Sequence, residues 1–355
     1  MRVESKKALF LGHIPPPHHG AAIIGEKVLS VMQELYDVSV FKVNVSTNIA
    51  EIGKASKSTL VFFLVRLVKD VIISLFKRKP SLVYLTPSLN GAAFYRDLVL
   101  MMIFYLYAFV TKSRIVCHIH MRPLILERNN LLNALWNLLT RRFEVILLSS
   151  SLKLDYSNSF KPIKIHYLNN AIDEIPCKNF SISSQVRTVL YIGHLLRSKG
   201  AFRVLELANE FRKENIVFKI AGEFGGESER LDFLQEIDAL ELKNIELLGR
   251  VEGDNKATLF HTSDVLLLPS YSEAQPLTIL EAFSCGLPVL ATPVGGIVDI
   301  LDEETGRCVP FEDFSEALES ILSKGRDHFS KRCREKYQSS FTNKSFVDNC
   351  KAILR

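Results

Sequence analysis

The chain has 355 residues and a formal net charge of +5, and its length predicts two domains, each large enough for its own hydrophobic core. Its six cysteines are scattered with no C-x-x-C spacing, which disfavours a zinc site or a disulfide framework and fits a reduced cytosolic protein. The apolar run near the amino terminus is too short for a signal peptide.

The charge is shared unevenly between the two halves. Residues 1–186 contain 23 Lys and Arg against 12 Asp and Glu, a net +11, whereas residues 187–355 contain 21 against 27, a net −6. A basic half in a chain with a mean hydropathy of +0.13 indicates an anionic partner. We expect a membrane surface, with an anionic substrate as the rival, and not nucleic acid, because no recognition motif accompanies the charge.

Strand-like and helix-like segments alternate along the whole chain, which predicts an α/β fold with parallel sheets. In the amino-terminal half, short apolar runs predict strands at 8–12, 82–86, 114–120, 145–149 and 165–168. Helices are predicted at 21–35, 58–79, 98–111 and 133–142, and a mobile loop at 42–57.

Two of these predicted helices have features of a membrane-contacting segment. Residues 58–79 combine an apolar face with basic side chains, which fits either an amphipathic helix on a membrane or a domain helix with one solvated side. Residues 98–111 carry no charge, but such a helix would rise only about 21 Å, against about 30 Å for a bilayer core. We therefore interpret 98–111 as a core helix or an interfacial anchor, not as a transmembrane span.

Two polar features follow predicted strands in this half. The loop at 12–22 contains three prolines and Gly20, which allows a ligand to approach the backbone closely. Alternation along the strand 114–120 places His118 and His120 on one face. They could bind a metal ion, but no third ligand has suitable spacing, so we expect no metal site.

The carboxyl-terminal half follows a polar linker at 173–185 and repeats the alternation. Strands are predicted at 188–192, 217–221, 245–248, Val265–Leu268 and 287–291. Helices are predicted at 202–213, 231–240, 252–262, Leu277–Ser284, 313–324, 329–340 and 342–354, with a further turn into a helix after Gly295 and Gly296.

Two glutamates bracket the start of the helix Leu277–Ser284. Glu273 lies in the preceding loop, and Glu281 lies eight positions later inside the helix. Pro276 suits a first helical position because it has no N–H to lose. The first turn offers free N–H groups and the positive end of the helix dipole, which together favour an anion. Glu281 is surrounded by apolar residues, and a buried carboxylate needs partners.

The stretch E-A-Q-P-L-T-I-L-E at 273–281 resembles the E-x7-E motif of retaining glycosyltransferases of the GT-B fold, of the family 4-like, group 1 type that includes enzymes of bacterial cell-surface polysaccharides. The match continues through G-L-P-V-L-A-T-P-V-G-G and T-G-R-C-V. The alternative is an ordinary Rossmann-like crossover that happens to carry a glutamate.

The resemblance implies two Rossmann-like domains that face a cleft. An acceptor-binding domain would span 1–176, and a nucleotide-sugar-binding domain would span 177–340. The last helix, at 341–355, would cross back to the first domain.

The resemblance also implies roles for matching residues. Glu273 would hold hydroxyls of the transferred sugar and Glu281 the ribose of the donor, while His120, a better match than His118, would approach the sugar. Lys199 would stabilise the negative charge that develops on the leaving diphosphate. The predicted catalytic residues are thus Glu273, His120 and Lys199. The predicted donor-binding positions are Gly20, His194, Arg197, Lys199, Gly222, Arg250, Gln275, Pro276, Leu277, Thr278 and Glu281.

The chain departs from the family pattern in three loops. His194 stands where the phosphate-binding G-R-L-x-x-x-K-G loop has an arginine. Arg197, three residues later, is a candidate to supply the missing positive charge, although the resemblance does not itself imply this role. His19 replaces the first glycine of a P-P-P-x-G-G loop, where it either contacts substrate or caps the loop. Ala171 replaces the glycine of the turn at 169–173. Arg122 is a candidate contact for an acceptor phosphate.

The implied activity is transfer of a hexose-type sugar, with retention, from a nucleotide-sugar to a saccharide acceptor. A UDP-sugar is the first expectation for the donor and a GDP-sugar the second. The chain has no D-x-D pair, so we expect no essential metal and no cofactor. The basic, apolar first half favours a lipid-linked acceptor at the inner face of the membrane, in the synthesis of lipopolysaccharide O-antigen, capsule or exopolysaccharide, by a peripherally bound cytoplasmic enzyme.

Two other functions stay open from the sequence. A sugar-nucleotide epimerase of the same fold would rearrange the nucleotide-sugar without an acceptor. An inactive scaffold in a polysaccharide assembly complex would show no turnover; His194 favours this alternative, and the intact pair of Glu273 and Glu281 argues against it.

Overall fold

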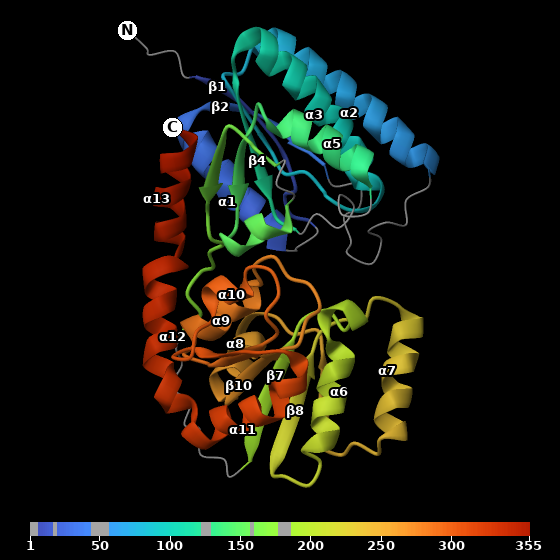
Figure 1. The fold of residues 1–355 in the computed structure, drawn as a ribbon, viewed down its shortest axis with the longest axis vertical. Coiled ribbons are helices and arrows are strands. Elements are labelled where there is room, and N and C mark those ends of the chain that lie inside the picture. Colours follow the sequence, from blue (N-terminus) through green and yellow to red (C-terminus); the bar gives the residue numbers. More distant parts are fainter. Residues whose placement is uncertain (1–5, 17–19, 44–56, 122–128, 157–159, 177–185) are drawn as a thin grey trace. The chain divides into compact units, whose positions relative to one another are not determined.

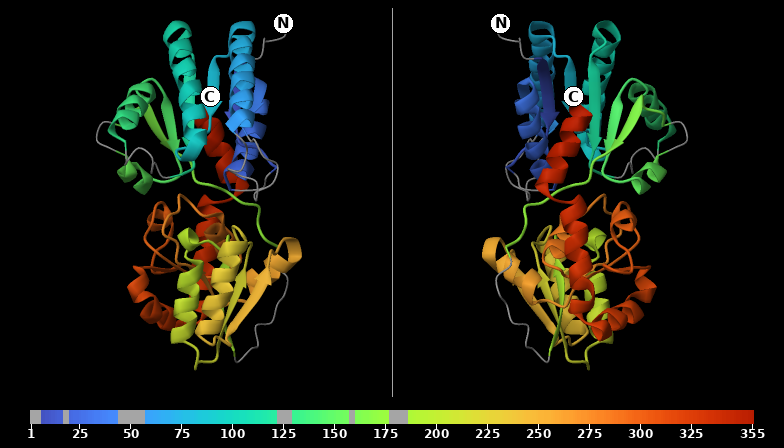
Figure 2. Two further views of the ribbon diagram at one scale, coloured as in Figure 1. Left: turned by 90° about the vertical axis from the view of Figure 1, so that its right-hand side faces the viewer. Right: turned by 90° about the vertical axis from the view of Figure 1, so that its left-hand side faces the viewer.

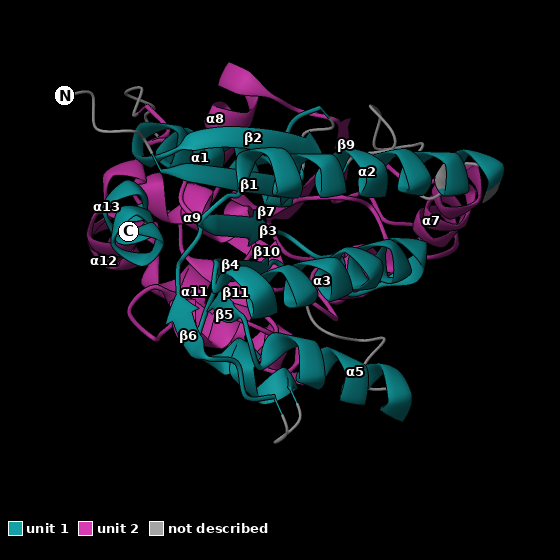
Figure 3. Cartoon of the chain, turned by 90° about the horizontal axis from the view of Figure 1, so that it is seen from above, with its two compact units in different colours: residues 1–170, 346–355 teal, residues 171–345 magenta. Residues whose placement is uncertain are grey.

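The computed structural model describes residues 6–16, 20–43, 57–121, 129–156, 160–176 and 186–355 (Figure 1). The chain forms two compact units (Figure 3). Unit 1 comprises Met1–Asn170 and Phe346–Arg355, and unit 2 comprises Ala171–Ser345. The last helix, α13 (Asn343–Leu354), therefore leaves unit 2 and ends in unit 1, which confirms the predicted return of the carboxyl terminus to the first domain.

The first boundary between the units lies at Ala171, a few residues before the predicted position at 176. Ile172 forms an isolated parallel bridge with Thr342, and its carbonyl accepts a hydrogen bond from the Tyr337 hydroxyl at 3.2 Å. These contacts attach the chain to unit 2 as soon as it leaves the last strand of unit 1. Most of the predicted linker, at 177–185, lies outside the described residues.

Unit 1 is built on a parallel sheet of six strands in the order β2-β1-β3-β4-β5-β6. They are β1 (Lys7–Gly12), β2 (Asp37–Lys42), β3 (Leu82–Leu85), β4 (Arg114–Ile119), β5 (Glu144–Leu147) and β6 (Lys164–Tyr167). The inner strands are almost entirely apolar because helices cover both faces. The sequence does not predict β2, because its D-V-S-V-F-K residues are half-buried or exposed at the edge of the sheet.

Helices cover the two faces of this sheet (Figures 1 and 3). On one face lie α1 (Gly20–Leu35) and the end of α13, and on the other lie α2 (Lys57–Arg78), α3 (Gly91–Thr111) and α5 (Asn130–Thr140). The Arg114 guanidinium donates to the carbonyl groups of Leu354 and Ile353 at 3.2 and 2.9 Å. A cation at the carboxyl end of a helix is favourable, so this contact fixes the end of α13 to unit 1.

Helix α3 is longer than predicted, and the length argument used for 98–111 is therefore wrong. The helix has 21 residues, which corresponds to a rise of about 32 Å. Among the described residues it is the one helix long and apolar enough to cross a membrane by length and composition. Its inner side nevertheless belongs to the core of unit 1, where the buried Arg96 pairs with Asp97 at 2.7 Å and Asp97 accepts the N–H of Ser88. One side of α3 is therefore a core helix of unit 1, while its other side exposes apolar residues.

Unit 2 contains a second parallel sheet of six strands, in the order β12-β11-β10-β7-β8-β9. They are β7 (Arg187–Ile192), β8 (Ile216–Ala221), β9 (Ile245–Gly249), β10 (Val265–Leu268), β11 (Val289–Ala291) and β12 (Gly306–Cys308). Its helices are α6 (Ala201–Glu210), α7 (Glu227–Ala239), α8 (Gly253–Thr262), α9 (Leu277–Ser284), α10 (Ile297–Ile300), α11 (Phe314–Lys324) and α12 (Arg326–Ser340) (Figure 2). The predicted architecture of two Rossmann-like parallel sheets is confirmed.

The buried side chain of Arg326, at the start of α12, joins the carboxyl ends of two helices in unit 2. Its guanidinium donates to the carbonyl groups of Phe260, His261 and Ser263 at the end of α8, at 3.0, 2.7 and 2.7 Å. It also donates to the carbonyls of Cys285 and Gly286, just after α9, at 2.5 and 3.2 Å. One cation thus satisfies carbonyl groups that have no partner within their own helices.

Replacing Arg326 with methionine should destabilise unit 2 by more than about 3 kcal/mol, because several buried carbonyl groups would lose their donor at once. The apolar stem of methionine keeps most of the packing, so the loss reports the hydrogen bonds. Chemical denaturation followed by circular dichroism measures the change.

The matched control is Arg332→Met on the same helix, since Arg332 is 56% exposed and forms ion pairs with Glu304 and Glu335 at the surface. We expect that variant to lose less than about 1 kcal/mol. Equal losses for the two variants would contradict a special role of Arg326.

Candidate active site

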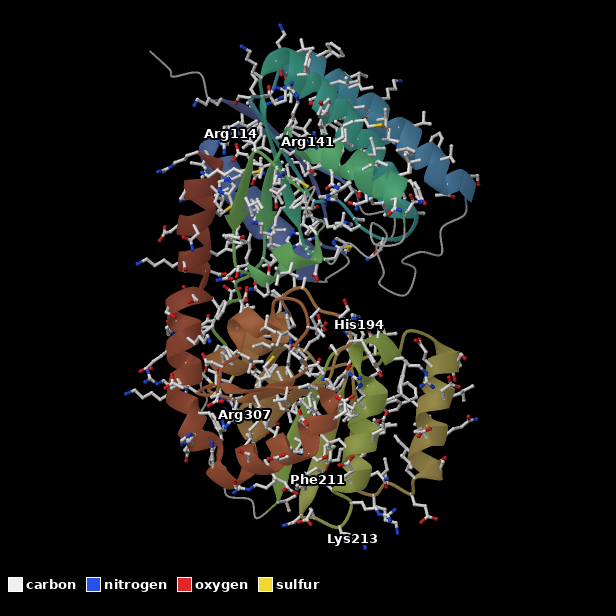
Figure 4. All side chains as sticks on the ribbon, in the orientation of Figure 1. Arg114, Arg141, His194, Phe211, Lys213 and Arg307 are labelled. Atoms are coloured by element: carbon white, nitrogen blue, oxygen red, sulfur yellow. The ribbon has the colours of Figure 1, made fainter. Side chains whose placement is uncertain are left out.

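The predicted donor site of unit 2 lies where the strand order of its sheet reverses. β7 and β10 are neighbours, and the later strands continue outward from them on opposite sides. The loops that follow β7 and β10 therefore meet at the carboxyl edge of the sheet, where ligands bind in folds of this kind. Figure 4 shows His194, from the loop after β7, at this edge, and Lys213, just after α6, at the opposite edge.

Lys199 and Glu273 form an ion pair between these two loops. Nζ of Lys199 lies 2.8 Å from Oε1 of Glu273, and the Ser270 hydroxyl donates to the same oxygen at 3.0 Å. The Tyr191 hydroxyl, from β7, donates to the carbonyls of His194 and Lys199 at 2.9 and 3.3 Å. Burial, and to a smaller degree the Glu273 charge, raises the pKa of Tyr191, so it remains a hydrogen-bond donor.

Two glycines allow the loops around this pair to touch. A Cβ at Gly200 would lie 2.1 Å from the carbonyl oxygen of Pro269, and a Cβ at Gly295 would lie 1.8 Å from that of Glu273. Both glycines also have positive φ. The N–H of Gly296 donates to the carbonyl of Ala274 at 2.7 Å, so the glycine turn after β11 fixes the backbone that carries Glu273.

The first turn of α9 follows Glu273 directly. Pro276 precedes the helix in an extended conformation, and Leu277 and Thr278 begin it. Like all N–H groups in the first turn of a helix, theirs have no carbonyl acceptor within the helix. Gln275 is buried beside this turn. The sequence prediction for α9 is correct to the residue, and the structure brings these positions next to the pair of Lys199 and Glu273.

Glu281 lies one turn into α9 and pairs with a residue that the sequence did not single out. Its Oε1 accepts from Nζ of Lys256, on α8, at 2.6 Å. Its Oε2 is buried and has no hydrogen-bond partner among the described residues. Burial raises the pKa of Glu281 above its usual value, and the Lys256 charge partly opposes that shift.

The glycine loop after β8 lies against the loop after β7. A Cβ at Gly222 would lie 1.7 Å from the carbonyl oxygen of Gly193, so no larger residue fits there. Arg250, just after β9, is exposed; it lies 3.4 Å from Glu223 of this loop and also pairs with Glu252. The structure thus brings Gly222 and Arg250 to the same edge as Lys199.

His194 and Arg197 occupy the loop after β7 in different ways. His194 is half-buried between β7 and the turn that contains Lys199. The Arg197 guanidinium lies 3.7 Å from the centre of the Phe202 ring and 3.7 Å from Asp232 of α7, and it is 64% exposed. In this structure Arg197 is therefore directed to α6 and α7 and not to Glu273, and its role as a replacement for the missing arginine stays a prediction.

The predicted site residues of unit 1 are described by themselves. Gly20 begins α1. His120 follows β4, and its ring centroid lies 4.0 Å from that of the buried His118, whose Nδ1 lies 2.7 Å from the Tyr84 hydroxyl. Burial, and next the neighbouring His120, lowers the pKa of His118, so this ring is neutral. Among the described residues no group of His, Cys, Asp or Glu could hold a metal ion. His19 and Arg122 lie outside the described residues.

Three contributors to the site were missed from the sequence. Lys256, Ser270 and Tyr191 each contact a predicted site residue. Lys256 lies on a polar helix, 25 positions before its partner Glu281, so no local sequence pattern identifies it. Ser270 could have been found, because it lies three positions before Glu273 at the end of a buried strand.

Part of the chain resembles known proteins in sequence. Residues 177–339 match the family of "Glycosyl transferases group 1". The D-inositol 3-phosphate glycosyltransferase of Mycobacteroides abscessus is 26% identical over 177 residues, which is 48% of this chain and 39% of that protein. An uncharacterized 41.2 kDa protein in the cps region of Klebsiella pneumoniae is 26% identical over 185 residues, covering 50% and 49%. The chain thus spans between a third and a half of the length of these relatives.

Solved structures match over nearly the whole chain. HepE of Anabaena, in complex with UDP and glucose, has a TM-score of 0.71 at 15% identity, covering 98% of this chain and 99% of its own. The sucrose-phosphate synthase of Thermosynechococcus elongatus has a TM-score of 0.76 at 15% identity, covering 98% of each chain. At this identity the likeness shows the fold alone. Residues 177–339 therefore match the group 1 glycosyltransferases in sequence, in a chain that has the GT-B fold.

Proposed function

We propose that this protein is a retaining glycosyltransferase that moves a hexose-type sugar from a nucleotide-sugar donor to a saccharide acceptor. The observation that carries the proposal is the grouping of Lys199, Glu273 and Glu281 around the first turn of α9, at the strand-order reversal of unit 2. Two carboxylates, a cation and a helix start offer one partner for each part of a nucleotide-sugar.

The charge around α9 suits the chemistry of such a transfer. Breaking the bond between sugar and phosphate builds negative charge on the leaving diphosphate. The N–H groups of Leu277 and Thr278 and the ammonium of Lys199 would stabilise that charge. Glu273 would accept hydrogen bonds from sugar hydroxyls, and Glu281 from the ribose. Because helix and lysine supply positive charge, we expect donor binding without an added metal ion.

The donor is proposed to be a UDP-sugar first and a GDP-sugar second. Three structures with this fold support the choice, since HepE is described in complex with UDP and with UDP-glucose, and the pneumococcal O-GlcNAc transferase GtfA in complex with UDP and GlcNAc. His120, at the end of β4, is proposed to approach the transferred sugar. Unit 1 is proposed to bind the acceptor.

The acceptor is proposed to be a lipid-linked saccharide in surface-polysaccharide synthesis. The relatives that support this include a protein in the cps region of Klebsiella pneumoniae and an alpha-galactosylglucosyldiacylglycerol synthase of Streptococcus pneumoniae. The lipopolysaccharide outer core galactosyltransferase WaaB shares the fold, with a TM-score of 0.69 at 15% identity. The protein would act in the cytoplasm, bound peripherally to the inner face of the membrane.

An exposed apolar surface on α2 and α3 supports the membrane proposal. We call it the α2–α3 surface; it comprises Val61, Phe62, Val65, Ile73 and Phe76 of α2 and Tyr95, Met102, Leu106, Phe109 and Val110 of α3. Phe62 and Phe76 are 72% and 75% exposed, and Val110 is 80% exposed. Exposed basic side chains on α2, or just after α2, α3 and α5, are Arg66, Lys69, Lys77, Lys79, Lys112, Arg141 and Arg142, of which Arg142 lies over the Phe109 ring. Exposed apolar and basic side chains on the same helices fit the boundary of an anionic bilayer.

Nucleotide binding tests the donor site. Calorimetric titration with UDP, GDP and ADP, without metal, should show selective binding of one of them. Glu281→Ala should weaken that binding about 10- to 100-fold, because a hydrogen bond to a charged group is lost. The control is Glu246→Ala, whose carboxylate is exposed and lies 3.9 Å from Lys219. Unchanged affinity in folded Glu281→Ala would contradict the assignment.

Turnover tests the role of the ion pair. Lys199→Met should lower kcat for sugar transfer by about 10²- to 10³-fold, the usual cost of removing one donor that stabilises developing charge. Lys219→Met, a partly exposed lysine of β8, should have little effect. Formation of an altered nucleotide-sugar without an acceptor would indicate the epimerase instead, and absence of any turnover in the wild type would indicate the scaffold.

Vesicle sedimentation tests the α2–α3 surface. The wild type should bind vesicles that contain phosphatidylglycerol more strongly than pure phosphatidylcholine vesicles. Phe62→Glu combined with Phe109→Glu should weaken binding at least about tenfold, because burying each phenyl ring contributes about 1.5–3 kcal/mol. Leu231→Glu, at a residue of α7 that is 50% exposed, is the control. Equal binding of all three proteins, or none by the wild type, would contradict the membrane proposal.

A further inference from the structure

The contact between Lys256 and Glu281 joins two helices of unit 2 at the proposed ribose site. Lys256 lies in the first turn of α8 and Glu281 in the second turn of α9. Their side chains are 29% and 16% exposed, and Nζ lies 2.6 Å from Oε1. A pair this short and this shielded from water is a specific contact, unlike the exposed pairs of the same unit such as Arg332 with Glu304 at 3.5 Å.

The other oxygen of Glu281 is left without a donor. Oε2 is buried and has no hydrogen-bond partner among the described residues. A carboxylate can accept about four hydrogen bonds, and Lys256 supplies one of them. A buried acceptor without a protein donor is costly, so this oxygen is available to accept hydrogen bonds from hydroxyl groups of a ligand.

We propose that Lys256 is a positioning residue of the donor site, which holds the Glu281 carboxylate in place and in its ionised form so that it can accept the hydroxyls of the donor ribose. The inference rests on the proposed function, because it takes Glu281 as the ribose contact. Lys256 acts through Glu281 and not by a contact of its own with the donor phosphates, whose proposed partner is Lys199.

The surroundings of α9 single out Lys256 for this role. Among the described residues of the elements around α9, Lys256 is the charged group that bonds to Glu281. Arg326 and Arg334 of α12 contact the opposite end of α9, at Cys285 and around Gly286, and the His261 ring lies 3.8 Å from the Cys285 sulfur. Strands β10 and β11, which flank this region, consist of buried apolar residues.

The balance of burial and charge at Glu281 gives the sign of the effect. Burial raises the pKa of Glu281, and the Lys256 ammonium opposes that rise. Without the ammonium the pKa rises further, and Glu281 takes up a proton at a higher pH than in the wild type. A protonated carboxyl group keeps only part of its acceptor capacity, so donor affinity should fall as the pH is lowered, and fall earlier in a variant that lacks the lysine.

The binding experiment compares Lys256→Met with the wild type in calorimetric titrations with UDP between about pH 5 and pH 8. If the wild type prefers GDP or ADP, that nucleotide is the probe. We expect about tenfold weaker binding at neutral pH and a larger deficit as the pH falls. Lys219→Met is the matched control. Lys219 lies on β8, is 27% exposed and also faces a glutamate, Glu246, at 3.9 Å. Affinities in Lys256→Met equal to those of the wild type throughout this range would overturn the proposal.

A double variant separates positioning from direct contact. If Lys256 acts through Glu281, Lys256→Met combined with Glu281→Gln should bind UDP no more weakly than Glu281→Gln alone. Additive losses, with no dependence on pH, would show that Lys256 contacts the donor itself and would overturn the proposal. If Glu281→Gln binds like the wild type while Lys256→Met is impaired, the ribose assignment of the proposed function fails first, and the inference falls with it.

Chemical denaturation gives a readout that does not depend on any ligand. A carboxyl group whose pKa is raised by folding favours the folded state at low pH and loses that contribution as the pH rises through its folded value. The deficit in stability of Lys256→Met should therefore shrink as the pH is lowered, and this dependence should vanish in the Glu281→Gln background. A stability deficit that does not depend on pH would overturn the inference about Lys256, whether or not a nucleotide binds. Absence of nucleotide binding would instead refute the proposed function, and the two failures can therefore be told apart.

Discussion

The hydrogen bonds of Arg326 are the constraint on which the rest of unit 2 depends. Five carbonyl groups from the ends of α8 and just after α9 accept from one buried guanidinium. A helix is a rigid rod, so fixing its carboxyl end also restricts the position of its first turns. Those turns carry Lys256 on α8 and Glu281 on α9, so the contact between them depends on a residue of α12 that lies outside the site.

At the amino-terminal end of α9, close contacts between backbone segments fix the position of the neighbouring loops. Gly200 and Gly295 let the loops after β7 and β11 press against the segment from Pro269 to Glu273. The backbone positions of Lys199 and Glu273 are therefore fixed, and this keeps their side chains within hydrogen-bond distance of each other. Preorganised charges of this kind stabilise a developing negative charge with little rearrangement. The helix start, the lysine and the two carboxylates thus form one electrostatic unit.

Much of the fold and part of the site could be predicted from the sequence. Buried parallel strands are continuous apolar runs, so nearly all inner strands were found, and α9 was predicted to the residue because Pro276 and Gly286 mark its ends. Edge strand β2 was missed because it lacks such a run, and α3 was predicted too short because Arg96 and Asp97 interrupt its apolar pattern while pairing with each other in the core. Side-chain pairs between distant segments that belong to no motif, such as Lys256 with Glu281, could not be predicted.

The site shows the same division between local and distant signals. Glu273 and Glu281 were found because a motif of nine consecutive residues contains both. Lys256 was not found, because its role depends on a contact with Glu281, 25 positions away, that forms only when the helices pack.

Hydrogen–deuterium exchange with and without UDP tests the proposed donor site most directly. We predict slower exchange at 193–200, 253–262 and 269–281 in unit 2 when the nucleotide is bound. Binding of UDP without protection of the first turn of α9 would contradict it.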